Sequence, residues 1–138
     1  KCLLCNRTED TEHLLFLCPE YSAQIWEAIN DAQKDVMIKL NLPSENLHMY
    51  NIMYSKSTKN FAKQYSITLD FLIAEIRRMI IRKRAQWLTK GKININFTRI
   101  CQHIFIVSNS LLHYLQYLGK DTTFIKEFNA SISARFMT

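Results

Sequence analysis

Residues 59–92 read KNFAKQYSITLDFLIAEIRRMIIRKRAQWLTKGK. Large apolar side chains recur in this stretch at intervals of three, four or seven residues: Phe61, Tyr65, Leu69, Leu72, Ile76, Ile80 and Trp87. In an α-helix this spacing gathers them into one stripe about 100° wide, which is the face that a helix buries. The pattern predicts a long helix over residues 59–89, ended by Gly91.

A second long helix is predicted over residues 96–118, ending at Gly119. Its apolar stripe consists of Phe97, Ile100, Cys101, Ile104, Leu111, Leu112, Leu115 and Leu118. A last, short helix is expected within residues 122–137. Because only a short turn separates the two long helices, we expect them to pair as an antiparallel hairpin.

The N-terminal half is less regular. Pro19 suits the first position of a helix, and apolar spacing predicts that helix over residues 20–33. Residues 36–42 alternate between apolar and polar side chains, so they form either a short strand or a continuation of the same helix. A short helix is then expected to begin near Ser44, its capping residue.

The composition favours a mostly α-helical chain. Only two glycines and two prolines occur in 138 residues, too few for the many tight turns of a β-sandwich or barrel. No apolar run is long enough to span a membrane. We expect a Cys/Cys/His/Cys zinc knuckle with the first helix at 1–34, a connecting segment with a short helix at 35–58, and a basic helical bundle at 59–138.

Four potential metal ligands crowd into the first eighteen residues. Cys2, Cys5, His13 and Cys18 have the spacing Cys-x2-Cys-x7-His-x4-Cys. Three thiolates and one imidazole complete a tetrahedral zinc shell with no open position, which is the mark of a structural site. Such cysteine usage favours a reducing compartment.

Two alternatives to zinc remain open, namely chance clustering of cysteines and a redox-active Cys-x-x-Cys pair. The fourth cysteine, Cys101, falls on an apolar stripe and is interpreted as a core residue. His48, His103 and His113 are scattered, and we interpret them as structural or surface residues rather than ligands.

Positive charge is concentrated in the C-terminal part of the chain. The net charge is +6. Residues 1–56 contain five Lys/Arg and eight Asp/Glu, a balance of −3, whereas residues 57–138 contain thirteen and four, a balance of +9. A basic half of this kind is typical of proteins that bind a polyanion.

The long helix holds most of these cations. They are Arg77, Arg78, Arg82, Lys83, Arg84, Lys90 and Lys92. We interpret them as a phosphate-binding ridge, because guanidinium and ammonium groups bind phosphate oxygens. A solvated helix end is the alternative. Lys83 is unusual, since it lies close to the apolar stripe. Trp87 continues that stripe, which favours a core position over base stacking.

The N-terminal motif resembles the cysteine-rich knuckle downstream of the polymerase domain in non-LTR (LINE-type) retrotransposon reverse transcriptases. The family pattern is Cys-x-x-Cys, an acidic loop, Glu-His-Leu, Phe, Cys-Pro, and Trp about eight residues after the last Cys. Residues 2–26 match each step, from Cys-Leu-Leu-Cys through Glu12-His13-Leu14 and Cys18-Pro19 to Trp26. The rest of the chain carries no motif that we assign.

The resemblance implies zinc-ligand roles for Cys2, Cys5, His13 and Cys18. It also implies that this region binds RNA or DNA during target-primed reverse transcription, holding template or target near the polymerase. We therefore expect the chain to be a fragment of a longer reverse transcriptase. Its expected partners are nucleic acid and the rest of the parent chain, and its expected localisation is nuclear and cytoplasmic.

Other functions stay open. The helices could instead dock on the rest of the parent protein, with zinc only stapling the N-terminal loop. An independent enzyme is the weakest hypothesis, because the sequence contains no Ser/His/Asp set, phosphate loop, polymerase Asp-Asp pair or endonuclease-type Asp/Glu-x-Lys set. A membrane-surface role for the basic helix is a minor rival.

Overall fold

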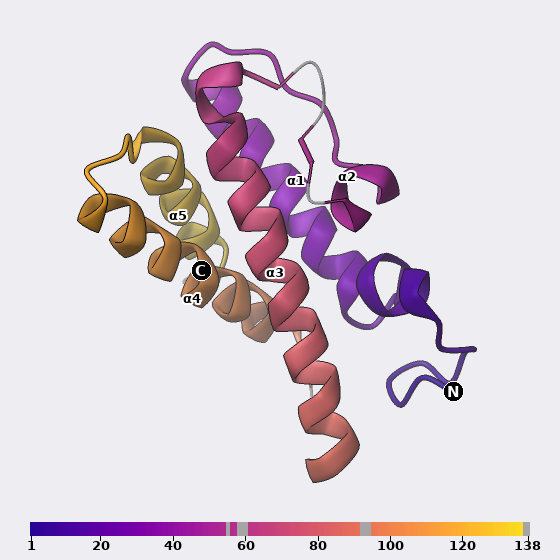
Figure 1. Ribbon diagram of the computed structural model, residues 1–138. Helices are drawn as coiled ribbons and strands as arrows, with labels where there is room; N and C mark the ends of the chain where they lie inside the picture. Colours follow the sequence, from indigo (N-terminus) through magenta and orange to yellow (C-terminus); the bar gives the residue numbers. More distant parts are fainter. Residues whose placement is uncertain (55, 58–60, 92–94, 137–138) are drawn as a thin grey trace.

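The computed structural model describes residues 1–54, 56–57, 61–91 and 95–136, in which helices joined by loops enclose one core (Figure 1). No strand occurs in these ranges. The mostly α-helical class is therefore confirmed. The helices are η1 (His13–Leu17, a π-helix), α1 (Ser22–Lys39), α2 (Met49–Met53), α3 (Lys63–Lys90), α4 (Phe97–Tyr117) and α5 (Thr123–Phe136).

The helix at the centre of the sequence argument is α3. It ends where predicted, because Gly91 leaves the helical conformation with φ +84° and donates its N–H to the Trp87 carbonyl at 3.0 Å. It begins at Lys63, and Phe61 packs into the core just ahead of it. The predicted first turn falls partly at residues 59–60, outside the described part of the chain.

The open choice between strand and helix at residues 36–42 is settled for residues 36–39, which continue the helix. α1 continues to Lys39, with Val36 and Met37 buried and Ile38 exposed on the outer face. The apolar residues at 36 and 38, which suggested a strand, therefore lie on different sides of the helix: Val36 is buried and Ile38 is exposed. Asn41 then takes the left-handed conformation, φ +58°, and ends the helix.

The helix start expected at Ser44 is wrong. Residues 42–48 have no regular secondary structure, and α2 begins at Met49 with His48 as its cap. Side chains of α1 bond to the backbone of this segment: Asn30 accepts the Leu47 N–H at 2.7 Å, and Gln33 donates to the Glu45 carbonyl at 2.7 Å. These bonds satisfy backbone groups that a helix would have paired internally.

The most closely paired helices are not the two long helices that were expected to form the hairpin. The most extensive contact is between α4 and α5, which fold back on each other at Gly119 (φ +69°) and pack against α1 (Figure 1). α4 also contacts α3, but antiparallel pairing of these two along their length is not confirmed. The last turns of α3 project beyond α1 and α5 in Figure 1.

A single core runs through all three expected segments. Its largest buried side chains include Tyr21, Trp26, Trp87, Phe124 and Phe128. Trp87 is 1% exposed and meets Tyr21 edge-on at 4.8 Å between ring centroids, so it is a core residue, as its stripe position favoured. Among the described helices, none is long and apolar enough to cross a membrane.

Candidate metal centre

The loop that carries the first two cysteines is folded tightly on itself. The Cys2 N–H donates to the Arg7 carbonyl at 2.7 Å, and the Asn6 N–H donates to the Cys2 carbonyl at 2.9 Å. Asn6 has φ +62°, a conformation that asparagine tolerates better than most residues. The turn brings the thiols of Cys2 and Cys5 to the same side of the loop.

The other two candidate ligands come from the two ends of η1. His13 is its first residue, and Cys18 follows its last and donates its N–H to the His13 carbonyl at 3.0 Å. The wider π-helical turn closes the interval of five residues between them. Both side chains therefore reach the loop that holds Cys2 and Cys5.

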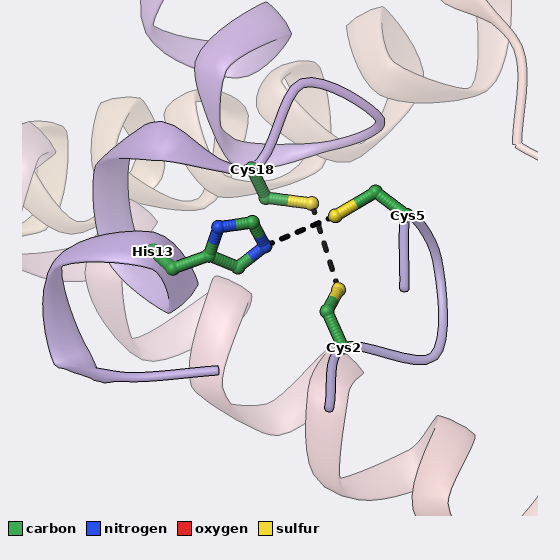
Figure 2. A group of neighbouring side chains, drawn as sticks. All are labelled: Cys2, Cys5, His13 and Cys18. Carbon is green, nitrogen blue, oxygen red and sulfur yellow. Dashed lines mark hydrogen bonds between the residues drawn. The ribbon is translucent and has the colours of Figure 1, made fainter. Parts of the chain in front are cut away.

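All four side chains point toward one centre (Figure 2). Their ligand atoms lie within 4.8 Å of one another. The Cys2 and Cys18 sulfurs are 3.9 Å apart, and the Cys5 sulfur is 3.2 Å from His13 Nε2. A tetrahedral zinc ion with bonds of about 2.3 Å to sulfur and 2.0 Å to nitrogen requires edges of roughly 3.8 Å and 3.5 Å. The four residues therefore fit a metal ion.

The geometry does not fit a disulfide. All four cysteines are free thiols, and the Cys2–Cys18 separation of 3.9 Å is far beyond the roughly 2.05 Å of a sulfur–sulfur bond. Cys101 is buried elsewhere in α4, as expected of a core residue.

Hydrogen bonds outside the cluster hold its backbone in place. Ser22 links both ends of η1, because its hydroxyl accepts the Cys18 N–H at 3.1 Å and donates to the His13 carbonyl at 3.2 Å. Asp10 accepts the His13 N–H at 2.7 Å. Trp26 donates its indole N–H to the Leu15 carbonyl at 2.6 Å. Such support keeps ligands oriented before a metal binds.

One cation of α3 belongs to this cluster. Arg84 is 8% exposed, and its guanidinium donates to the Cys2 sulfur at 2.8 Å and approaches the Cys18 sulfur at 3.9 Å. The same guanidinium hydrogen-bonds the Glu9 carboxylate. Arg84 therefore does not lie on an exposed phosphate-binding ridge.

The pKa values of the Cys2 and Cys18 thiols are shifted in opposite directions. Burial opposes ionisation of Cys2, but the hydrogen bonds that it accepts from Arg84 and from the backbone of Cys5 and Leu4 outweigh burial and lower its pKa to about 6. Burial raises the pKa of Cys18 to about 11, against a hydrogen bond from the Glu20 backbone. A divalent cation at the centre would favour the thiolate at every sulfur.

The charges also fit a dication. Three thiolates, a neutral imidazole and a divalent ion carry a net charge of −1, and a buried charge of that kind needs a partner. Arg84 supplies one positive charge beside two of the sulfurs, which offsets the −1 of the cluster, and the Glu9 carboxylate that also bonds the guanidinium is partly exposed to solvent. Four protein ligands leave no open position, so the arrangement suits a structural ion and not a catalytic one.

The remaining predicted cations are distributed along α3. Arg78, Arg82 and Lys90 are exposed, and Arg77 and Lys83 are half-buried. Arg78 pairs with Glu75 at 2.8 Å. Lys92 lies outside the described residues. The structure thus keeps several cations of the predicted ridge on the surface of α3, with Arg84 turned inward.

The role of Arg84 escaped sequence reasoning, although a signal was present. The apolar stripe of α3 has a gap between Ile80 and Trp87, and Arg84 stands four residues after the first and three before the second. That spacing places Arg84 on the same face as its apolar neighbours. A cation at such a position requires a buried partner, and here the partners are sulfurs and a carboxylate.

Comparisons with models of protein families, with curated proteins and with solved structures gave no match for this chain.

Proposed function

We propose that Cys2, Cys5, His13 and Cys18 form a zinc knuckle that holds one structural Zn²⁺. The support is the proximity of the four donor atoms, all within 4.8 Å, and the donor set itself, because three thiolates and an imidazole prefer zinc among the divalent ions common in cells. The ion would contribute folding energy to the N-terminal loop.

We further propose that the chain is the nucleic-acid-binding C-terminal segment of a non-LTR retrotransposon reverse transcriptase. It would hold template RNA or target DNA during target-primed reverse transcription and would be non-catalytic by itself. The observation that carries this proposal is that α3 both anchors the knuckle, through Arg84, and presents Arg78, Arg82 and Lys90 to solvent. The resemblance of residues 2–26 to the knuckle of that family supports the family part of the proposal.

The proposed mechanism is electrostatic. Exposed arginines and lysines would contact phosphate oxygens and release condensed counterions, so binding would depend little on sequence and strongly on salt. The knuckle would fix the direction of α3 relative to the N-terminal loop, because the Arg84 guanidinium is bonded to the cluster. A fixed row of cations loses less side-chain freedom on binding than a mobile one.

The test is binding of the zinc-loaded chain to single-stranded RNA, an RNA stem-loop and duplex DNA across a salt series. A slope of log K against log[salt] of about −3 or steeper indicates several phosphate contacts, at roughly 0.7–0.9 per contact. Charge reversal at Arg77, Arg78 and Arg82 should abolish this binding while the helical content is unchanged. Undiminished affinity in the folded variant would reject the proposal.

A second function is favoured by a separate observation. Large apolar side chains are exposed on α3 and α4, among them Ile67 at 69%, Leu88 at 73% and Ile106 at 63%. Exposed apolar surface of this kind often marks protein contacts. The chain would then be a zinc-stapled module that docks on the rest of the parent protein. Tight binding of a polymerase fragment, with nucleic-acid affinity near background, would favour this function.

A further inference from the structure

A hollow of about 240 Å³ opens between α3 and α4. Its polar lining consists of Arg82, Lys83, Gln86 and His103, and three apolar side chains complete it. The volume is below the roughly 300–1,000 Å³ of sites that hold drug-sized ligands. A small polar group therefore fits the hollow better than a whole nucleoside does.

The hollow is positively charged. Two of its lining side chains are cations and none is acidic, and Arg99 on α4 lies near enough to act on His103 electrostatically. The unusual position of Lys83 close to the apolar stripe is explained here, because at Lys83 that side of α3 meets the hollow and not a packed core. Cations gathered in a concave, partly apolar site attract anions more strongly than the same cations on a flat surface.

His103 adds a neutral imidazole ring. Its Nδ1 is 3.0 Å from the Tyr21 hydroxyl. Burial raises the pKa of Tyr21, so the hydroxyl keeps its proton and is able either to donate to Nδ1 or to accept from it. Burial, together with the positive charges of Lys83 and Arg99, lowers the pKa of His103 to about 4, which keeps the ring neutral at pH 7. In the tautomer in which the Tyr21 hydroxyl donates to Nδ1, the ring hydrogen is on Nε2.

We propose that this hollow binds one phosphate group of a nucleic-acid backbone, through Arg82, Lys83, Gln86 and His103 in its Nε2–H tautomer. The proposal rests on the nucleic-acid function above and assigns one of its phosphate contacts to this hollow. Every polar side chain of the lining can donate hydrogen bonds, as a phosphate oxygen requires. Arg78 and Lys90 extend the positive charge along the exposed side of α3, which favours a polyanion over a single free anion.

The experiment is a titration of the zinc-loaded chain followed by NMR at pH 7 in phosphate-free buffer. The ligands are inorganic phosphate, a short single-stranded RNA, and vesicles with and without anionic lipid. The ring signals of His103 report on the hollow, and those of exposed His113 are the internal control. Lys83→Gln tests the site, and Lys90→Gln removes the same charge from an exposed position of the same helix.

We expect phosphate and RNA each to shift His103 saturably and to leave His113 in place. Lys83→Gln should lower the affinity for both ligands by about fivefold or more, and Lys90→Gln should lower the affinity for phosphate by less than about twofold. The reason is that an ion pair at a half-buried lysine contributes more binding free energy than one at an exposed lysine. If Lys83→Gln fails to fold, exposed Arg82→Gln replaces it with the same expected loss.

Equal losses of inorganic-phosphate affinity in the two lysine variants, or equal shifts of His103 and His113, would overturn the phosphate site. If RNA still binds with a steep salt slope in that case, the proposed function stands and only the site is rejected. If inorganic phosphate shifts His103 but RNA does not bind, the nucleic-acid source is rejected together with the proposed function. Binding to anionic vesicles under those conditions would assign the phosphate to a lipid headgroup.

Discussion

The guanidinium of Arg84 donates a hydrogen bond to the sulfur of Cys2 at 2.8 Å, although 82 positions separate the two residues. This bond joins the basic helix α3 to the N-terminal loop at the point where a metal ion fits. Arg84 also bonds the Glu9 carboxylate, so the guanidinium is satisfied on both sides. The cation is therefore part of the metal centre's surroundings.

Replacing Arg84 with methionine should destabilise the folded chain by about 2–3 kcal/mol. Breaking one side of a buried ion pair typically costs about 3–5 kcal/mol, and the partly exposed Glu9 partner reduces that loss. Zinc affinity should fall by about 10–100-fold, as for other residues that support metal ligands. Urea unfolding and zinc competition with a chelator measure the two effects.

Arg82→Met is the matched control for that variant. Arg82 is exposed on the same helix, two residues away, so its loss should change stability by no more than about 0.5 kcal/mol and leave zinc affinity intact. If both variants lose the same stability and affinity, Arg84 has no special relation to the cluster.

Each chain should bind one zinc ion through the four predicted ligands. Cys5→Ala is expected to abolish stoichiometric zinc binding, because three donors remain where four are needed. Cys101→Ala removes a thiol buried elsewhere in α4 and should retain one ion per chain. Metal analysis after gel filtration, with cobalt absorption as a second readout, measures this. Equal zinc content in the two variants would remove Cys5 from the ligand set.

The sequence was sufficient for what depends on local spacing. Three cysteines and a histidine within eighteen residues predicted the cluster, and apolar intervals predicted α3 and α4 to within a few residues at the ends that the structure describes. Both signals are local, because a chelating turn and a helical face each need only residues near one another in the chain.

What escaped the sequence depends on contacts between distant segments. Ser44 looked like a helix cap, but Asn30 and Gln33 of α1 bond to the backbone of the residues that follow, which form no helix before Met49. Arg84 looked like a surface cation, but Cys2 and Glu9 bury it. In each case a tertiary hydrogen bond overrides a local preference, and no spacing rule contains the partner.

Removing zinc should loosen the N-terminal loop before the rest of the chain. The cluster closes residues 1–18, whereas α4 and α5 are held by their own apolar faces. Hydrogen exchange after chelator treatment should show loss of protection over residues 1–30, a smaller loss around Arg84, and retained protection in α4 and α5. Simultaneous loss of protection along the entire chain would contradict this order.

His103 should make stability fall in mildly acidic solution. Its pKa is about 4 in the folded chain and near 6.5 when unfolded. Between these values the unfolded chain binds a proton that the folded chain does not, so the contribution of His103 is complete above pH 6.5 and is lost as the pH falls toward 4. The loss amounts to at most about 3 kcal/mol, from the size of that difference.

The measurement is urea unfolding between pH 4 and 7 for the parent chain, His103→Gln and His113→Gln. The glutamine at position 103 can still accept from the Tyr21 hydroxyl but does not titrate, so stability should depend less steeply on pH in this variant. His113 is exposed, and its variant should follow the parent. Protonation of the zinc ligands also weakens all three proteins in acid, but that effect is shared and cancels in the comparison. Identical pH profiles for the parent and His103→Gln would show that the ring of His103 accepts its proton equally in the folded and unfolded chain.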